Sequence, residues 1–138
     1  MNVLIALFDA THAFNSRAHD WWAEHADTGW ASCPLTENGV ARVMTNPSYS
    51  HSRRFTLEEV IESLTKFAAG TNHEFWPDDL TLRDSKTFAT NRIHGGRQLT
   101  DLYLLALAAK HNGRLVTFDQ KILISAVKKA TPDNLCVL

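Results

Sequence analysis

The stretch TDLYLLALAAKHNGRLVTFD, residues 100–119, predicts the organisation of the whole chain. Apolar side chains recur within it at intervals of three and four residues, which is typical of one buried helix face: Leu102, Leu105, Ala106 and Ala109. The tripeptide His-Asn-Gly at 111–113 predicts the end of this helix, with Gly113 in the left-handed conformation that closes many helices. Residues 114–118 then predict a short buried strand. The stretch is therefore expected to form one helix followed directly by one strand.

A carboxylate lies near each end of this stretch, Asp101 at its start and Asp119 at its end. The helix should rise roughly 16 Å, at about 1.5 Å per residue. The strand should return roughly 17 Å, at about 3.3 Å per residue. We therefore expect Asp119 to lie close to Asp101, at the same end of the unit. Because two like charges at close range repel each other unless a cation lies between them, the pair predicts a cation site.

Length and composition indicate one globular domain. The chain has 138 residues, of which 44% are hydrophobic and 21% are charged. Its net charge of −1 gives no overall basic field that would indicate nucleic-acid binding, although a local basic rim would serve. Cys33 and Cys136 lack metal-type spacing, so we interpret them as buried thiols of a cytoplasmic protein. No apolar run reaches the length of a membrane span, and the first ten residues lack the basic flank of a signal peptide.

The remaining sequence predicts short strands that alternate with helices. Strands are expected over 30–36, 73–77, 114–118 and 134–138, and residues 2–8 fit either a strand or a buried helical turn. Further helices are expected over 9–25, after Glu37, from a capping box at 56–59 to Gly70, near 84–88, and over 122–130. This alternation predicts an α/β fold with a parallel sheet and helices on its faces, in a single domain of residues 1–138.

Three acids fall where a site is expected. In parallel sheets the site lies outside the carboxyl ends of the strands. Glu37 follows one predicted strand, Asp119 follows another, and Asp101 begins a helix. Hard carboxylate oxygens favour Mg²⁺ or Mn²⁺. A divalent ion held by acids can activate a water and stabilise an in-line phosphoryl displacement, which is the chemistry of nucleases and phosphatases.

Each acid also has an ordinary structural explanation. Glu37 and Asp101 suit the first turn of a helix because of the helix dipole, with Thr100 as the N-cap of the second helix. Asp119 suits the cap of a helix over 120–130. The three acids together favour the metal site. The seven histidines are interpreted as surface or packing residues, and the four tryptophans as core or dimer-interface residues. No Ser–His or Cys–His constellation is visible in the sequence, so the expected nucleophile is water.

Five segments, in this order, resemble the PIN-domain ribonuclease toxins of the VapC type: NVLIALFDATH, PLTENGVARVM, FWPDD, LTDLYLLALA and LVTFD. The resemblance covers nearly the whole chain. It implies a PIN-like three-layer α/β fold, with a short, mostly parallel sheet flanked by helices. It also implies an acidic site that depends on Mg²⁺ or Mn²⁺ and cleaves RNA, a homodimer, and a cognate antitoxin that inhibits the nuclease.

The same resemblance assigns roles to individual residues. Glu37 in TENG, Asp101 in LTDLYLLALA and Asp119 in TFD match the metal-site acids. Thr100 and Thr117 match supporting hydroxyls beside them, and Asn2 is a further supporting residue. As a hypothesis, one or more of three arginines lines the RNA groove and contacts phosphate: Arg42, Arg92 and Arg97. The choice of RNA target would then depend on the loops 46–55 and 91–99.

The sequence departs from the family at its first motif. The family's first acid lies two residues before an Asn that matches Asn2, so the strand that carries this acid is expected to be missing or shortened. Three explanations stay open. The true start lies a few residues upstream, or the protein is a catalytically impaired relative that binds antitoxin or RNA without cleavage. In the third explanation, residues 2–8 form a strand that delivers Asp9 to the metal, although the following residues fit better if 2–8 are the family's first helix.

A phosphatase-like or DNA-directed metal hydrolase is a further alternative for the function.

Overall fold

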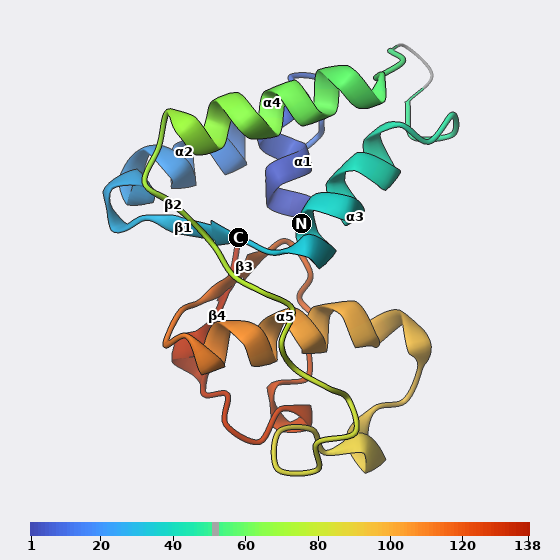
Figure 1. Cartoon of the computed structure of the whole chain (residues 1–138), viewed down its shortest axis with the longest axis vertical. Coiled ribbons are helices and arrows are strands. Elements are labelled where there is room, and N and C mark those ends of the chain that lie inside the picture. The colour runs from blue at the N-terminus through green and yellow to red at the C-terminus, as the bar shows by residue number, and fades with distance from the viewer. Residues whose placement is uncertain (51–52) are drawn as a thin grey trace. The chain divides into compact units, whose positions relative to one another are not determined.

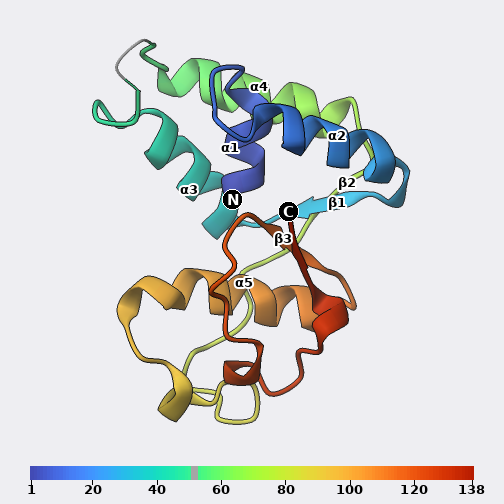
Figure 2. The ribbon, with the colours of Figure 1, turned by 180° about the vertical axis from the view of Figure 1, so that it is seen from behind.

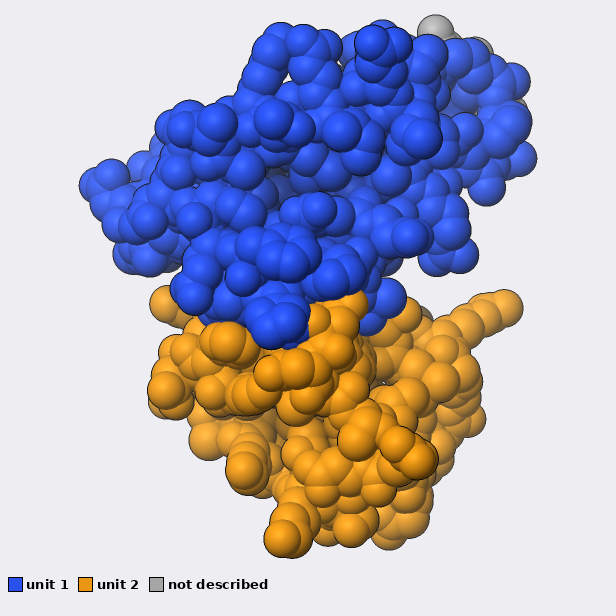
Figure 3. Space-filling model, in the orientation of Figure 1, with its two compact units in different colours: residues 1–77 blue, residues 78–138 orange. Residues whose placement is uncertain are grey.

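The structure is a computed structural model that describes residues 1–50 and 53–138. The chain forms two compact units, unit 1 over residues 1–77 and unit 2 over residues 78–138 (Figure 3). Each unit combines helices with one pair of parallel strands, which confirms the prediction of a mixed α/β fold. No helix in the described ranges is both long and apolar enough to span a membrane.

Unit 1 packs its helices beside a two-stranded parallel sheet (Figures 1 and 2). Its elements are α1 (Asn2–Phe8), α2 (Asn15–His25), β1 (Trp30–Ser32), α3 (Pro34–Met44), α4 (Leu57–Ala69) and β2 (His73–Phe75). In the sheet, Trp30 lies opposite His73 and Ser32 lies opposite Phe75. Helix α1 contacts α2 and α3, and α3 contacts α4.

Residues 2–8 form a helix and not a strand. Residues 3–7 of α1 are buried, so the apolar run fills the core of unit 1 from every side of a short helix. The prediction of a strand over 2–8 that delivers Asp9 to a metal is therefore wrong. The position of α1 agrees with the alternative in which these residues are the first helix of the resembled family.

The strand expected over 30–36 is shorter than predicted. It ends at Ser32, and Pro34 is the first residue of α3. Proline suits this position because its missing N–H would have no partner within the helix. As a result, Glu37 lies in the first turn of α3 and does not directly follow a strand.

The capping box that begins α4 is confirmed. The Thr56 hydroxyl accepts the Glu59 N–H at 3.1 Å, and the Glu59 carboxylate accepts the Thr56 N–H at 2.7 Å. The apolar side chains of α4 are only partly buried. Val60 and Leu64 belong to the core, whereas Leu57 and Ile61 are 59% and 47% exposed.

Unit 2 is built around α5 (Leu99–Lys110), which confirms the central helix of the prediction. It is followed by β3 (Leu115–Thr117), which pairs in parallel with β4 (Leu135–Val137). Short 3₁₀ turns fill the connections: η2 (Thr90–Arg92), η3 (Gly96–Gln98), η4 (Ile124–Ala126) and η5 (Pro132–Asn134). The buried cluster comprises Phe88, Leu102, Leu105, Ala106, Ala126 and Val127.

The end of α5 differs in one detail from the prediction. Asn112, with φ of 54°, is the residue in the left-handed region, and not Gly113. Asparagine tolerates this conformation better than most residues. The Gly113 N–H then donates to the Ala108 carbonyl at 2.8 Å, which closes the helix.

The predictions of a helix near 84–88 and of a helix over 122–130, both in unit 2, are wrong. Residues 84–88 form turns, in which the Asp84 carboxylate accepts the Lys86 N–H and the Thr87 hydroxyl. Within 122–130 only the short 3₁₀ turn η4 is helical. The reason is tertiary, because the backbone near Phe88 forms an antiparallel bridge with Val127 in place of helical hydrogen bonds.

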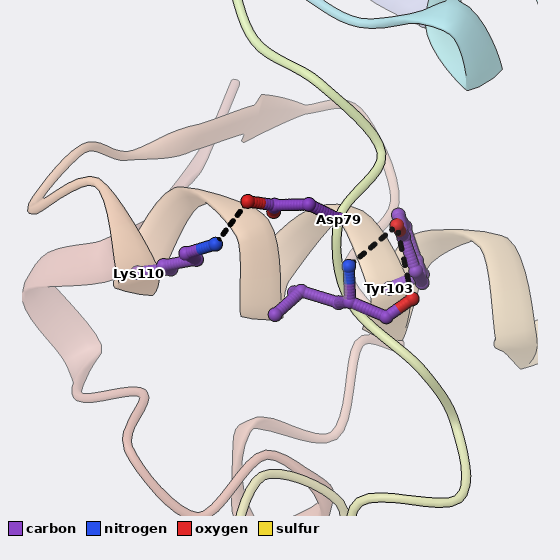
Figure 4. A network of polar contacts seen from close by, with 4 residues as sticks. Asp79, Tyr103 and Lys110 are labelled. Carbon is purple, nitrogen blue, oxygen red and sulfur yellow. Dashed lines mark hydrogen bonds and ion pairs between the residues drawn. The ribbon is translucent and has the colours of Figure 1, made fainter.

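The first residues of unit 2 contact side chains of α5 (Figure 4). Asp79 forms an ion pair with Lys110, which holds the pKa of the Asp79 carboxyl below its usual range. The Tyr103 hydroxyl lies 3.3 Å from the Leu80 nitrogen and 3.4 Å from its carbonyl oxygen. These contacts hold the segment that enters the unit against the helix that carries Asp101.

Candidate active site

Asp101 and Asp119 lie together, as their positions in the sequence predict. Asp101 is in the first turn of α5, and Asp119 follows the end of β3 by two residues. Both line one cavity of about 180 Å³, together with Arg97, Gln98 and Lys121. The helix and the strand that follows it therefore bring two carboxylates to one end of unit 2.

The electrostatics of this pair favour a cation. Burial raises the pKa of the Asp101 carboxyl above its usual value of 3.8, and the negative charge of Asp119 raises it further. Both effects disfavour the ionised form of Asp101 and are offset when a positive charge lies beside it.

The residues predicted to support the acids take different positions. Thr117 is 2% exposed, and its hydroxyl accepts the Asp119 N–H at 3.1 Å. Thr100 is the second residue of α5, and Gln98 is its N-cap, so the ordinary explanation of Thr100 as the cap is wrong. Asn2 is the first residue of α1, in unit 1.

Glu37 belongs to unit 1, where its carboxylate has a partner that the sequence did not reveal. The Ser32 hydroxyl donates to Glu37 Oε1 at 2.5 Å, and Ser32 Oγ also lies 2.9 Å from His73 Nε2. The structure thus contains a Ser–His contact that could not be seen in the sequence. Ser32 and His73 are separated by 41 residues, and only the pairing of β1 with β2 brings them together.

Asp9 is a structural residue of unit 1. It is 3% exposed, and its carboxylate accepts hydrogen bonds from the Thr11 N–H, the Thr11 hydroxyl and the Tyr49 hydroxyl, at 2.8–2.9 Å. Burial and the nearby Asp9 carboxylate raise the pKa of Tyr49. With three donors already directed at it, Asp9 is a poor candidate for a metal ligand.

Two carboxylates, and not three, line the cavity. In the ranges 1–50 and 53–138, no three His, Cys, Asp or Glu side chains form a group that could hold a metal ion. The oxygens of Asp101 and Asp119 are nevertheless the hard donors that Mg²⁺ and Mn²⁺ prefer. The pair fits such an ion as part of its ligand set.

The three candidate arginines occupy separate places. Arg97 lines the cavity of the two acids. Arg92 lines a second, polar cavity of unit 2 with Lys128, and its guanidinium donates to the Ser125 carbonyl at 3.3 Å. Arg42 is exposed in the last turn of α3. Of the two loops expected to select RNA, 46–55 includes residues 51–52, which lie outside the described residues.

Comparison with known proteins decides the family, because residues 1–129 match the PIN domain. The chain belongs to the PIN-domain family. This PIN-domain protein is 41% identical to ribonuclease VapC44 of Mycobacterium tuberculosis over 138 residues, which is all of the chain and 96% of that relative. Ribonuclease VapC39 of the same organism is 36% identical over 126 residues, or 91% of the chain and 90% of the relative. The resemblance to the VapC type is confirmed.

Proposed function

We propose that this PIN-domain protein is a metal-dependent endoribonuclease, the toxin of a toxin–antitoxin pair. The observation that carries the proposal is the convergence of Asp101 and Asp119 on one cavity, where burial and like charge favour a cation. Its relatives, which are named ribonucleases, support RNA as the substrate. Action in the cytoplasm is part of the same proposal, because two cysteines without metal-type spacing suit a protein of a reducing compartment.

Asp101 and Asp119 would hold one or two Mg²⁺ or Mn²⁺ ions, and Glu37 of unit 1 stays a candidate ligand on its TENG motif alone. When bound, such an ion supplies an activated water and neutralises the charge that develops on the phosphate. Thr117 orients Asp119 by accepting its N–H. Ser32 is a poor nucleophile because it is 3% exposed and donates its proton to Glu37, so water stays the proposed nucleophile.

The distribution of charge supports RNA contact by unit 2. Unit 1 has nine Asp and Glu against five Lys and Arg, whereas unit 2 has nine Lys and Arg against six Asp and Glu. A basic surface is the electrostatic requirement for binding a phosphate backbone. We propose that Arg97, beside the two acids, and Arg92, beside Lys128, contact phosphates of the substrate, whereas Arg42 is a weaker candidate on the acidic unit.

The RNA contacts are tested by fluorescence anisotropy of a labelled RNA in EDTA, where no cleavage occurs. Arg92→Gln and Arg97→Gln are each expected to weaken binding several-fold and to reduce the dependence of affinity on salt. The matched control is Arg114→Gln, an exposed arginine of unit 2 beyond the far end of α5. Equal affinity for the two variants and the control would remove these arginines from the RNA site.

The exposed apolar side chains of helix α4 support the binding of a protein partner. Leu57 and Ile61 are one turn apart and expose apolar surface, which is typical of protein interfaces. We propose that this face contributes to the homodimer, and that a cognate antitoxin binds the same toxin. Ile61→Lys should then shift the protein from dimer to monomer in light scattering, while the exposed control Ala69→Lys, at the end of α4 and off this face, should not. A dimer that persists in Ile61→Lys would move the interface elsewhere.

The activity is tested by cleavage of a panel of labelled RNAs with Mn²⁺, Mg²⁺ or EDTA. Metal-dependent cleavage is expected, and it should fall at least about 100-fold in Asp101→Asn and Asp119→Asn, since even second-shell substitutions at metal sites cost 10–100-fold. The matched control is Asp133→Asn, an exposed aspartate of η5 that should leave cleavage unchanged. A parallel series with DNA and a phosphate monoester distinguishes the other metal hydrolases.

The alternative is a PIN-domain module that binds antitoxin or RNA without cleaving it. The observation that favours it is that only two carboxylates line the cavity among the described residues. RNA binding without cleavage in any metal would support this module. A second protein, extended at its N-terminus by a strand that carries an aspartate, tests whether a further acid restores cleavage.

A further inference from the structure

Unit 2 has a second cavity, of about 490 Å³, the Arg92 cavity, whose polar wall includes Asn91, Arg92 and Lys128. We propose that the Arg92 cavity is a subsite for a phosphate of the RNA strand that is cut at Asp101 and Asp119. This inference rests on the proposed function for the identity of the strand, and it gives that strand a second point of attachment away from the two acids. Lys128 and Asn91 become contacts of the substrate that neither the sequence motifs nor the comparisons assign.

The backbone of unit 2 fixes the positions of the two cations. Residues 87–89 pair with residues 126–128 through an antiparallel bridge and backbone hydrogen bonds of 2.9 Å. Arg92 follows the first of these segments, and Lys128 ends the second. The Arg92 guanidinium donates to the Ser125 carbonyl at 3.3 Å, which holds the arginine against the second segment. Two positive side chains from different parts of the chain are thus brought to one cavity.

The charge of the Arg92 cavity favours an anion. Among the described residues, no Asp or Glu lines the cavity. Across 1–50 and 53–138, no carboxylate forms an ion pair with Arg92 or Lys128. A guanidinium presents a rigid fork of donors that matches two phosphate oxygens, and the Asn91 amide can donate to a further oxygen. A phosphate therefore suits this cavity in both charge and hydrogen bonding.

The Arg92 cavity is a neighbour of the cavity that holds Asp101 and Asp119. Leu123 lines the cavity of the acids, and Ser125 lines the Arg92 cavity. Two residues of chain span at most about 7 Å, so the walls of the two cavities lie close together within unit 2. Because a phosphate recurs at every nucleotide, a strand with one phosphate at the acids has further phosphates within reach of Arg92. The preferred substrate is therefore RNA with several nucleotides around the cut.

The first test uses inorganic phosphate in EDTA, so it does not depend on cleavage. Phosphate titrated into the ¹⁵N-labelled protein should shift the amide signals of 89–92 and 125–128 in a saturable manner. The signals of 98–102 should move less, because acids without a cation repel an anion. Lys128→Gln should weaken phosphate binding several-fold. The matched control is Lys129→Gln, which removes the adjacent exposed charge outside the cavity and should leave binding unchanged.

Two results of this titration would overturn the subsite. One is the absence of a saturable shift in 89–92 and 125–128. The other is an equal loss of phosphate binding in Lys128→Gln and Lys129→Gln, which would mean that only the general charge of the surface attracts the anion.

The second test asks whether the phosphate belongs to RNA. The affinity for a labelled single-stranded RNA is measured by fluorescence anisotropy in EDTA over a series of salt concentrations. Loss of one phosphate contact in Lys128→Gln should make the plot of log affinity against log salt less steep by about 0.7. Lys128→Arg, which keeps the charge, should retain the wild-type slope. A wild-type slope in Lys128→Gln would overturn the RNA subsite, even if the cavity binds free phosphate.

The outcomes also separate this inference from the proposed ribonuclease. A reduced salt slope in Lys128→Gln, in a protein that cleaves no RNA with any metal, would leave the subsite standing and reject the ribonuclease. Metal-dependent cleavage by the wild-type protein, with a wild-type slope in Lys128→Gln, would keep the ribonuclease and reject the subsite.

Discussion

At the scale of single residues, the hydrogen bonds to the Asp9 carboxylate should stabilise the fold of unit 1. Burial alone would raise its pKa, but hydrogen bonds from Thr11 and Tyr49 outweigh that effect and hold the pKa below the usual value of 3.8. Because the pKa is lower in the folded state, the stabilising contribution is complete above about pH 4 and is lost as pH falls through the folded value.

Asp9→Asn tests this contribution. The substitution should lower the free energy of unfolding at pH 7 by about 2 kcal/mol, as expected for hydrogen bonds to a charged group. At pH 3 the difference from the wild-type protein should be smaller. Urea unfolding followed by tryptophan fluorescence measures both values, with the exposed Asp27→Asn as control. An equal loss at the two pH values would contradict the role of the charge.

The pH dependence of stability that comes from Asp101 should have the opposite sign to that from Asp9. Burial and Asp119 raise the pKa of Asp101 in the folded state, so the protein gains stability as pH falls through that value and is destabilised by the charge at neutral pH. In EDTA at pH 7, Asp101→Asn should therefore raise the melting temperature while it abolishes cleavage. Calorimetry with and without Mn²⁺ checks this, since metal should stabilise only the wild-type protein. A lower melting temperature for Asp101→Asn in EDTA would show that the acid is structural.

At the scale of elements, α4 offers a direct test of local helix chemistry. Thr56→Ala removes the hydroxyl that accepts the Glu59 N–H and should cost about 1 kcal/mol in the free energy of unfolding. Thr65→Ala removes the same atoms from the middle of the helix, where the hydroxyl only bonds back to the Ile61 carbonyl, and should have little effect. Urea unfolding followed by tryptophan fluorescence compares the two. Equal effects would show that the cap contributes nothing specific.

At the scale of the whole molecule, the single domain predicted for residues 1–138 is open to a spectroscopic test. All four tryptophans lie in unit 1, whereas helical circular dichroism reports on both units, including α5. If the chain unfolds as one domain, the two signals should give the same midpoint and the same slope in urea. Two separate transitions, with the tryptophan signal following one of them, would mean that the units unfold independently.

The sequence by itself determined the features that depend on local chemistry. The periodicity of 102–109 gave α5, the Thr56 capping box gave the start of α4, and the helix-then-strand order brought Asp101 to Asp119. These predictions succeeded because hydrophobic spacing and capping act over a few residues. The five quoted motifs likewise identified the family, which the match over 1–129 confirms.

Only the tertiary structure decided the features that depend on distant contacts. Residues 122–130 have helical spacing, but their backbone bonds to the segment near Phe88, because an available tertiary partner outweighs a weak local preference. The contact of Ser32 with His73 required the pairing of two strands 41 residues apart. One of the three hydrogen-bond donors to Asp9, the Tyr49 hydroxyl, likewise reaches it across 40 residues. The sequence specifies which chemical groups these side chains carry. The pairing and packing of the backbone determines which partners those groups contact.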